Sequence, residues 1–157
     1  MRHRCQRDSL PGMTKPLKPM KLQTPASWVA AVTEPSVADF RAQPSVQHRG
    51  IAAAREVYHV HERIFQYWGR IDPSRIHNTD DEKDFARYLR GVSRDFEILG
   101  DAADATKHHA LRNTTRFVLT ASMASTVSGG AITVGPSGPS LLATIDAVMA
   151  LYRAHYL

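Results

Sequence analysis

The chain has very little cysteine, because Cys5 is the only one among its 157 residues. A single thiol excludes an intramolecular disulfide, and it excludes a zinc site built from several cysteines. Low cysteine use is typical of proteins kept in a reducing compartment, where disulfides do not persist. We therefore expect a cytoplasmic protein.

Long hydrophobic runs are missing as well. No stretch approaches the roughly 18 uncharged apolar residues that a membrane-spanning helix needs. The N-terminal region is charged but lacks the apolar run of a secretory signal. We expect neither a membrane partner nor a cleaved leader.

The short motifs of several common catalytic classes are also absent from the sequence. It contains no phosphate-binding loop, no glycine pattern of dinucleotide-binding folds and no nucleophile elbow. The segment 135–139 is rich in glycine, but its two prolines lack the N–H groups that would hold a phosphate. We predict no cofactor and no bound metal.

The net positive charge is confined to the N-terminal end. The whole chain carries a formal charge of +5, and residues 1–22 hold six Lys or Arg against one Asp, while the rest of the chain is balanced. Low hydrophobicity and four prolines predict a basic tail over residues 1–34, with 28–32 as a short element docking on the body. The tail is either a disordered extension, which a start at Met13 or Met20 would shorten, or an electrostatic arm for RNA, DNA or an anionic membrane.

The pattern of the remaining residues, 35–157, predicts a single mainly α domain. Apolar residues recur every three or four positions, which is typical of amphipathic helices. Helices are expected over residues 37–43, from Ser45 or His48 to about Trp68, over 80–92, over 96–113 and over 141–155. Alternating apolar and polar residues predict one β-hairpin at about 115–135. The predicted fold is a four- to five-helix bundle with this hairpin inserted before the C-terminal helix.

The boundaries of three helices carry specific expectations. Gly69 is expected to end the long second helix, and Ser140 is expected to cap the last one. Around Ser93–Asp95, the pattern allows either a kink in one continuous helix or the start of a new one.

The helix predicted over 96–111 has two faces of opposite character. Its apolar face is formed by Phe96, Leu99, Ala103, Thr106 and Ala110. Its polar face is formed by Glu97, Asp101, Asp104 and His108. Carboxylates and an imidazole on one face can divide acid and base roles or hold a metal ion.

The histidines of the long second helix allow two further interpretations. Glu56 and His59 form an E-x-x-H pair, which could join Asp104 and His108 in a metal site, but bundle metal sites use two such pairs and only one is present. His61 lies in the apolar stripe of its helix, so we expect it to be a hydrogen-bonded core histidine.

Another pattern points to RNA-cleaving helical proteins of the HEPN type, which use Arg-x(4–6)-His. Three pairs match it: Arg41/His48, Arg55/His61 and Arg70/His77. About two matches are expected by chance in a chain of this composition, so the pattern alone does not identify the class.

Two segments resemble a group of small uncharacterised bacterial proteins, some of them phage-associated. One segment is Ala53-Ala54 followed by His59-Val60-His61-Glu62, and the other is Asp101-Ala102-Ala103-Asp104-Ala105-Thr106-Lys107-His108, which is similar to a D-x-A-N/D-x-x-K-H signature. The resemblance covers about residues 37–157. It implies that Asp101, Asp104, Lys107 and His108 are site residues, with His59 opposite them.

These observations leave two main functions open. The first is an interaction or assembly module with a protein partner or a second copy of the chain, in which Asp101, Asp104 and Lys107 fix the helix packing. The alternative is a HEPN-like protein that acts on nucleic acid, such as an RNase or toxin of a defence system, with nucleic acid bound through the basic tail. That alternative predicts a polar cleft containing His59, Asp104, Lys107 and His108.

Overall fold

The computed structural model describes residues 23–105, 119–121, 132–134 and 139–157, and this part of the chain is mainly helical. Its helices run in the order α1 (Pro25–Trp28), a π-helical turn (Val29–Thr33), α2 (Glu34–Ala42), α3 (Gln47–Ile71), a 3-10 turn (Pro73–Ile76), α4 (Glu82–Val92), α5 (Arg94–Ala105) and α6 (Leu141–His155). Because α1, the π turn and α2 follow one another without a break, the described residues form a bundle of five helical rods. None of the described helices is both long and apolar enough to cross a membrane.

The first rod corrects the predicted boundary of the tail, because residues 25–34 are helical and packed on the bundle. Thr24 caps its start, where its hydroxyl oxygen accepts a hydrogen bond from the Ser27 N–H at 3.1 Å. Val29 and Thr33 of this rod are buried, and the π turn that holds them packs against α3. Pro25, one of the four prolines that suggested a tail, stands in the first turn of α1, where a helix tolerates proline, and Pro35 stands in the same way in the first turn of α2. The predicted element at 28–32 is part of this rod.

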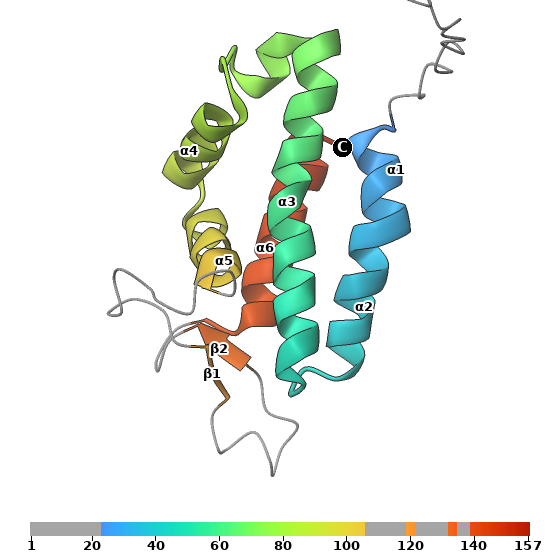
Figure 1. Cartoon of the computed structure of the whole chain (residues 1–157), viewed down its shortest axis with the longest axis vertical. Helices are drawn as coiled ribbons and strands as arrows, with labels where there is room; N and C mark the ends of the chain where they lie inside the picture. The colour runs from blue at the N-terminus through green and yellow to red at the C-terminus, as the bar shows by residue number, and fades with distance from the viewer. Residues whose placement is uncertain (1–22, 106–118, 122–131, 135–138) are drawn as a thin grey trace, which may run out of the picture.

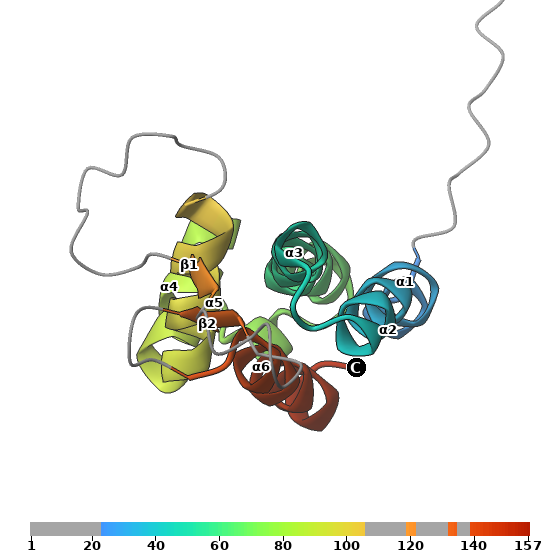
Figure 2. The same cartoon turned by 90° about the horizontal axis from the view of Figure 1, so that it is seen from below.

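The long helix α3 forms the centre of the bundle. Figure 1 shows α1 and α2 on one side of it, α4 and α5 on the other, and α6 behind it. Seen from below, α3 and α6 lie between these two flanking groups (Figure 2). Its residues Val57, Val60 and Ile64 are fully buried, which agrees with the predicted apolar stripe. The prediction that Gly69 ends the helix was wrong: α3 continues to Ile71, because the residue before a proline is the one that leaves the helical region, and here that residue is Asp72.

Helices α4 and α5 are separate helices. The Asp81 carboxylate caps α4 by accepting the Asp84 N–H at 2.8 Å, and the Ser93 hydroxyl accepts the Phe96 N–H at 3.1 Å at the start of α5. Between them Ser93 has an extended backbone, so the chain breaks here rather than kinking.

The apolar face predicted for α5 is confirmed as far as the structure describes it, since Phe96, Leu99 and Ala103 are fully buried. Gly100 allows α5 to approach α3 closely, because a Cβ atom at this position would lie 2.8 Å from the Tyr58 ring.

The C-terminal end contains two short strands and the last helix. Strands β1 (Leu119–Ala121) and β2 (Ile132–Val134) pair in antiparallel fashion, with Leu119 opposite Val134. The turn of the predicted hairpin at about 115–135 falls outside the described residues, so the hairpin itself stays a prediction. The last helix is confirmed: the Ser140 hydroxyl caps it through the Ala143 N–H at 3.1 Å.

Candidate functional site

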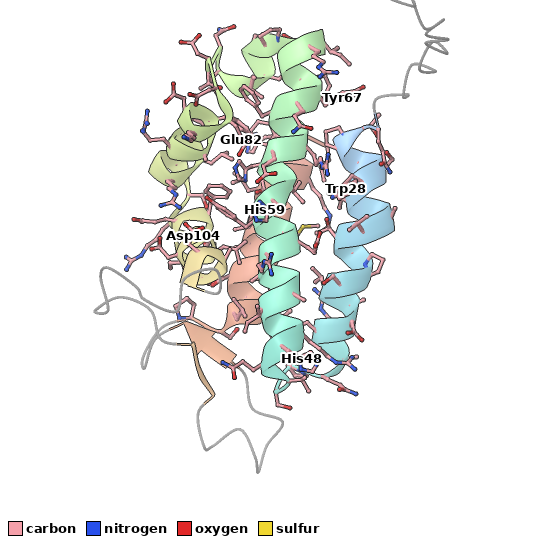
Figure 3. All side chains as sticks on the ribbon, viewed as in Figure 1. Trp28, His48, His59, Tyr67, Glu82 and Asp104 are labelled. Carbon is pink, nitrogen blue, oxygen red and sulfur yellow. The ribbon has the colours of Figure 1, made fainter. Side chains whose placement is uncertain are left out.

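A polar cleft of about 520 Å³ opens between α3, α4 and α5. It is lined by Tyr58, His59, His61, Glu62, Glu82, Lys83, Ala86, Arg87, Arg90 and Asp104. Figure 3 shows three of these, His59 on α3, Glu82 on α4 and Asp104 on α5, on the side of the bundle where these helices face one another. Trp28 and His48 lie elsewhere on the molecule.

His61 is a buried histidine at the wall of this cleft, with only 2% of its surface exposed. Its Nδ1–H donates a hydrogen bond to the Tyr58 carbonyl at 2.6 Å, and because a carbonyl can only accept, this bond fixes the tautomer with the lone pair on Nε2. Burial lowers the pKa of His61, so the neutral form dominates at neutral pH. The prediction of a hydrogen-bonded core histidine is confirmed. His61 also faces the cleft, because its Nε2 lies 3.7 Å from the Glu82 carboxylate.

His59 forms a dyad with Glu62, one turn further along α3. The Nδ1–H of His59 donates to Glu62 Oε1, which leaves its Nε2 as the acceptor nitrogen. Both side chains are about one-third exposed (30% and 33%), so a bound molecule can reach them. The sequence suggested Glu56 as the partner of His59 in an E-x-x-H pair. In the structure, His59 forms a hydrogen bond with Glu62 instead, and Glu56 is not among the residues that line the cleft.

Glu82 reaches the same place from the first turn of α4. One ligand atom each from His61, Glu62 and Glu82 lies within 4.8 Å of the others. Burial raises the pKa of Glu82, and the negative charge of Glu62 raises it further. Two carboxylates and a neutral imidazole are thus brought together with their acceptor atoms facing one another.

Arg90 of α4 links three helices. Its guanidinium donates to the Tyr58 hydroxyl at 3.3 Å on α3, and it lies 3.7 Å from the Asp101 carboxylate and 3.8 Å from the Asp104 carboxylate on α5. Burial acts to lower the pKa of Arg90, but the hydrogen bond to Tyr58 and the negative charges of Asp101 and Asp104 outweigh it, so the net shift is upward. The cation is therefore permanent, with its charge facing the cleft.

The structure brings some of the predicted site residues together. His59 and Asp104 line one cleft, and Asp101 is connected to it through Arg90. Lys107 and His108 lie outside the described residues.

Sequence reasoning did not name Glu62, Glu82 or Arg90 as site residues, although Glu62 stands in one of the two resemblance segments, and it placed His61 only in the core. The spacing of three between His59 and Glu62 was a readable signal. No local signal could have shown that Glu82 and Arg90, on another helix, face α3.

Comparison with protein-family models, with curated proteins and with solved structures finds no match to this chain. The function therefore has to be argued from the cleft.

Proposed function

We propose that this domain acts on nucleic acid and that the cleft between α3, α4 and α5 cleaves RNA by acid–base chemistry. The observation that carries the proposal is the pairing of His59 with Glu62 in the same cleft as Arg90. A histidine whose Nδ1–H is held by a carboxylate presents its Nε2 as a base in a fixed orientation. A permanent guanidinium nearby supplies the charge that a phosphate oxygen needs.

The roles follow from the chemistry of each group. His59 Nε2 takes the proton of a ribose 2′-hydroxyl while its oxygen attacks the neighbouring phosphorus. The bond from phosphorus to the 5′-oxygen breaks, and that oxygen takes a proton from water in the open cleft. Glu62 stabilises the imidazolium that forms, and Arg90 binds a non-bridging phosphate oxygen. Asp101 and Asp104 are positioning residues, because they hold Arg90 rather than touch the substrate.

Size and charge both suit a nucleotide segment. A cleft of about 520 Å³ falls within the range of about 300–1,000 Å³ typical of small-molecule sites. Lys83, Arg87 and Arg90 lie along it, and the six basic residues of segment 1–22 add sequence-independent attraction for a phosphate backbone.

The test is cleavage of a fluorescent single-stranded RNA by the full chain. We expect His59→Ala to lower the cleavage rate by about 10²–10⁴-fold, as removal of a general base does. The matched control is His48→Ala, an exposed histidine at the N-terminal end of the same helix (Figure 3), which should leave the rate unchanged. A DNA of the same sequence should resist, since it lacks the 2′-hydroxyl. Equal cleavage by the parent protein and His59→Ala would refute the proposal.

The interaction or assembly module is the second candidate, and one observation favours it. Arg90 holds Asp101 and Asp104, two of the residues singled out by the bacterial signature, in a network that joins α3, α4 and α5. In this reading, those acids serve helix packing, and the partner is a protein or a second copy of the chain. Light scattering would show a defined oligomer that His59→Ala leaves intact, together with no RNA cleavage by the parent protein.

A further inference from the structure

The grouping of His61, Glu62 and Glu82 raises a question that acid–base chemistry does not answer. Their ligand atoms lie within 4.8 Å of one another, although none of the three carries a positive charge at neutral pH when His61 is neutral. Like acceptor atoms repel unless a proton or a cation lies between them. The group comes from two helices, since His61 and Glu62 belong to α3 and Glu82 to α4.

The geometry of His61 is that of a metal-binding histidine. Its Nδ1–H is held by a backbone carbonyl at 2.6 Å, which fixes the ring and points the lone pair of Nε2 the other way. Metal-binding histidines almost always donate their second ring N–H to such an acceptor. The side chain is 3% exposed, so this nitrogen is aimed by packing and is not free to turn away.

The distance to the nearest carboxylate fits two ligands of one ion. His61 Nε2 and Glu82 Oε1 are 3.7 Å apart, which is too far for a hydrogen bond. Two ligands of a tetrahedral ion, each about 2.0–2.1 Å from the metal, lie roughly 3.4 Å from each other. The small difference is within the reach of the Glu82 side chain, which is 43% exposed and has room to move.

We propose that His61 Nε2, Glu62 and Glu82 bind a divalent transition-metal cation, such as Zn²⁺ or Mn²⁺, at the wall of the cleft. One nitrogen and two carboxylate ligands suit these ions, and the remaining coordination positions face the cleft, open to water or substrate. His59 orients Glu62 from behind by its hydrogen bond, as outer-shell partners of metal ligands do. The inference goes beyond the proposed RNA cleavage, because it depends on the three ligands alone and is tested without a substrate.

The two arginines that line the cleft both have carboxylate partners of their own. Arg90 is engaged by Asp101 and Asp104, and Arg87 donates to Asp84 at 2.5 Å. The alternative occupant of the cluster is a proton shared between the carboxylates and His61, which would need no metal.

Isothermal titration of the chelator-treated full chain with ZnCl₂ and with MnCl₂ tests the proposal. We expect one equivalent of at least one of these ions to bind, with the affinity falling at least tenfold in Glu82→Gln. The matched control is Glu56→Gln, on α3 but outside the cleft, which should bind as the parent does. His59→Ala should weaken binding by about 10-fold or more, the effect of losing an outer-shell partner.

Glu82 is partly exposed, so Glu82→Gln is expected to fold, and a circular dichroism melt of each variant checks this. His61→Gln supports the same conclusion if it folds and loses binding. An absence of saturable binding of either ion would overturn the proposal in favour of the shared proton. Binding that survives Glu82→Gln but disappears in a His3→Ala/Cys5→Ser double variant would overturn it too, since the ion would then sit on residues 1–22. Neither of these results would affect the RNA cleavage assay with His59→Ala, which tests the proposed function separately.

Discussion

The groove between α2 and α6 and the cleft between α3, α4 and α5 both carry charged side chains, yet their charges are arranged differently. The groove has a volume of about 300 Å³ and carries two ion pairs at short range: Arg41 donates to Asp146 at 2.6 Å, and Arg153 donates to Glu34 at 3.0 Å. All four side chains are about half exposed. These are ordinary surface pairs, each contributing about 0–1 kcal/mol.

In the cleft the arrangement is less balanced. Two carboxylates lie beside a buried neutral imidazole, and the contacts of Arg90 with Asp101 and Asp104 are 3.7 and 3.8 Å long. Strained combinations of titratable groups of this kind gather at functional sites, because a ligand, proton or metal ion completes them. The paired surface charges of the groove therefore carry no functional argument, whereas the close grouping of His61, Glu62 and Glu82 makes the cleft the candidate site.

Gly100→Ala should produce the largest change in stability, because it disturbs the packing of α5 against α3 beside the cleft. A Cβ atom would lie 2.8 Å from the Tyr58 ring and 3.0 Å from Arg90, so α5 must shift away from α3. We expect a loss of about 1–3 kcal/mol, the usual cost of overpacking, measured by urea unfolding.

Gly91→Ala is the matched control for this substitution. It lies in α4 with no atom within 4 Å of the new Cβ, so alanine should stabilise by about 0.5–1 kcal/mol. If both glycine variants shift stability in the same direction, the close approach of α5 to Tyr58 is not the cause.

Tyr152 should make the bundle sensitive to alkali from within the core, where its hydroxyl donates to the Tyr58 carbonyl at 3.4 Å. Complete burial raises the pKa of Tyr152 well above its ordinary value. The folded state therefore keeps the proton longer than the unfolded chain does, so stability is full below about pH 10 and falls by about 1.4 kcal/mol per pH unit above it. Tyr156, whose pKa is raised to about 12, adds to the same trend.

Tyr152→Phe removes one of these two hydroxyl groups. The stability of the variant, followed by thermal melts, should therefore fall less steeply between pH 10 and 11.5 than that of the parent. Tyr67→Phe, at a partly exposed tyrosine of α3, is the matched control for the loss of a tyrosine hydroxyl. A slope identical in the parent and in Tyr152→Phe would show that this hydroxyl is not protected by burial.

Arg90→Met should have a smaller effect on stability than Gly100→Ala or the ionisation of Tyr152, because the guanidinium is 35% exposed and solvent screens its contacts. Its loss leaves Asp101 and Asp104 without their shared cation, and we expect about 1 kcal/mol of destabilisation. Arg41→Met in the α2–α6 groove is the counterpart and should cost no more than about 0.5 kcal/mol. Equal costs in chemical unfolding would mean that the two surfaces are energetically alike.

Most of the helices could be predicted from the sequence, because the apolar spacing of a helix is written into neighbouring residues. The last helix was predicted with its cap, since Ser140 and the apolar residues behind it are a complete local signal. The predicted helix over 37–43 falls on α2, but the beginning of the first rod was assigned to the tail because Pro25 continues the series of prolines of that tail. Only the structure shows that Pro25 stands in the first turn of a helix, a position that proline is permitted to occupy.

The candidate site was predictable only in part. His59 and Asp104 were singled out, and both line the cleft, whereas Glu82, which lines it too, was not. A helical period tells which side of a helix is buried, but it does not tell which residue of another helix packs against it.

By itself, then, the sequence determined the amphipathic helices, the burial of His61 and the concentration of positive charge in residues 1–22, since each depends on local composition or spacing. Only the tertiary structure decided that Glu82 faces His61 and Glu62, and that Arg90 faces Asp101 and Asp104. The physical reason is that these contacts arise from the angle at which α3, α4 and α5 pack. That angle depends on close approaches such as Gly100 against Tyr58, which no single helix encodes.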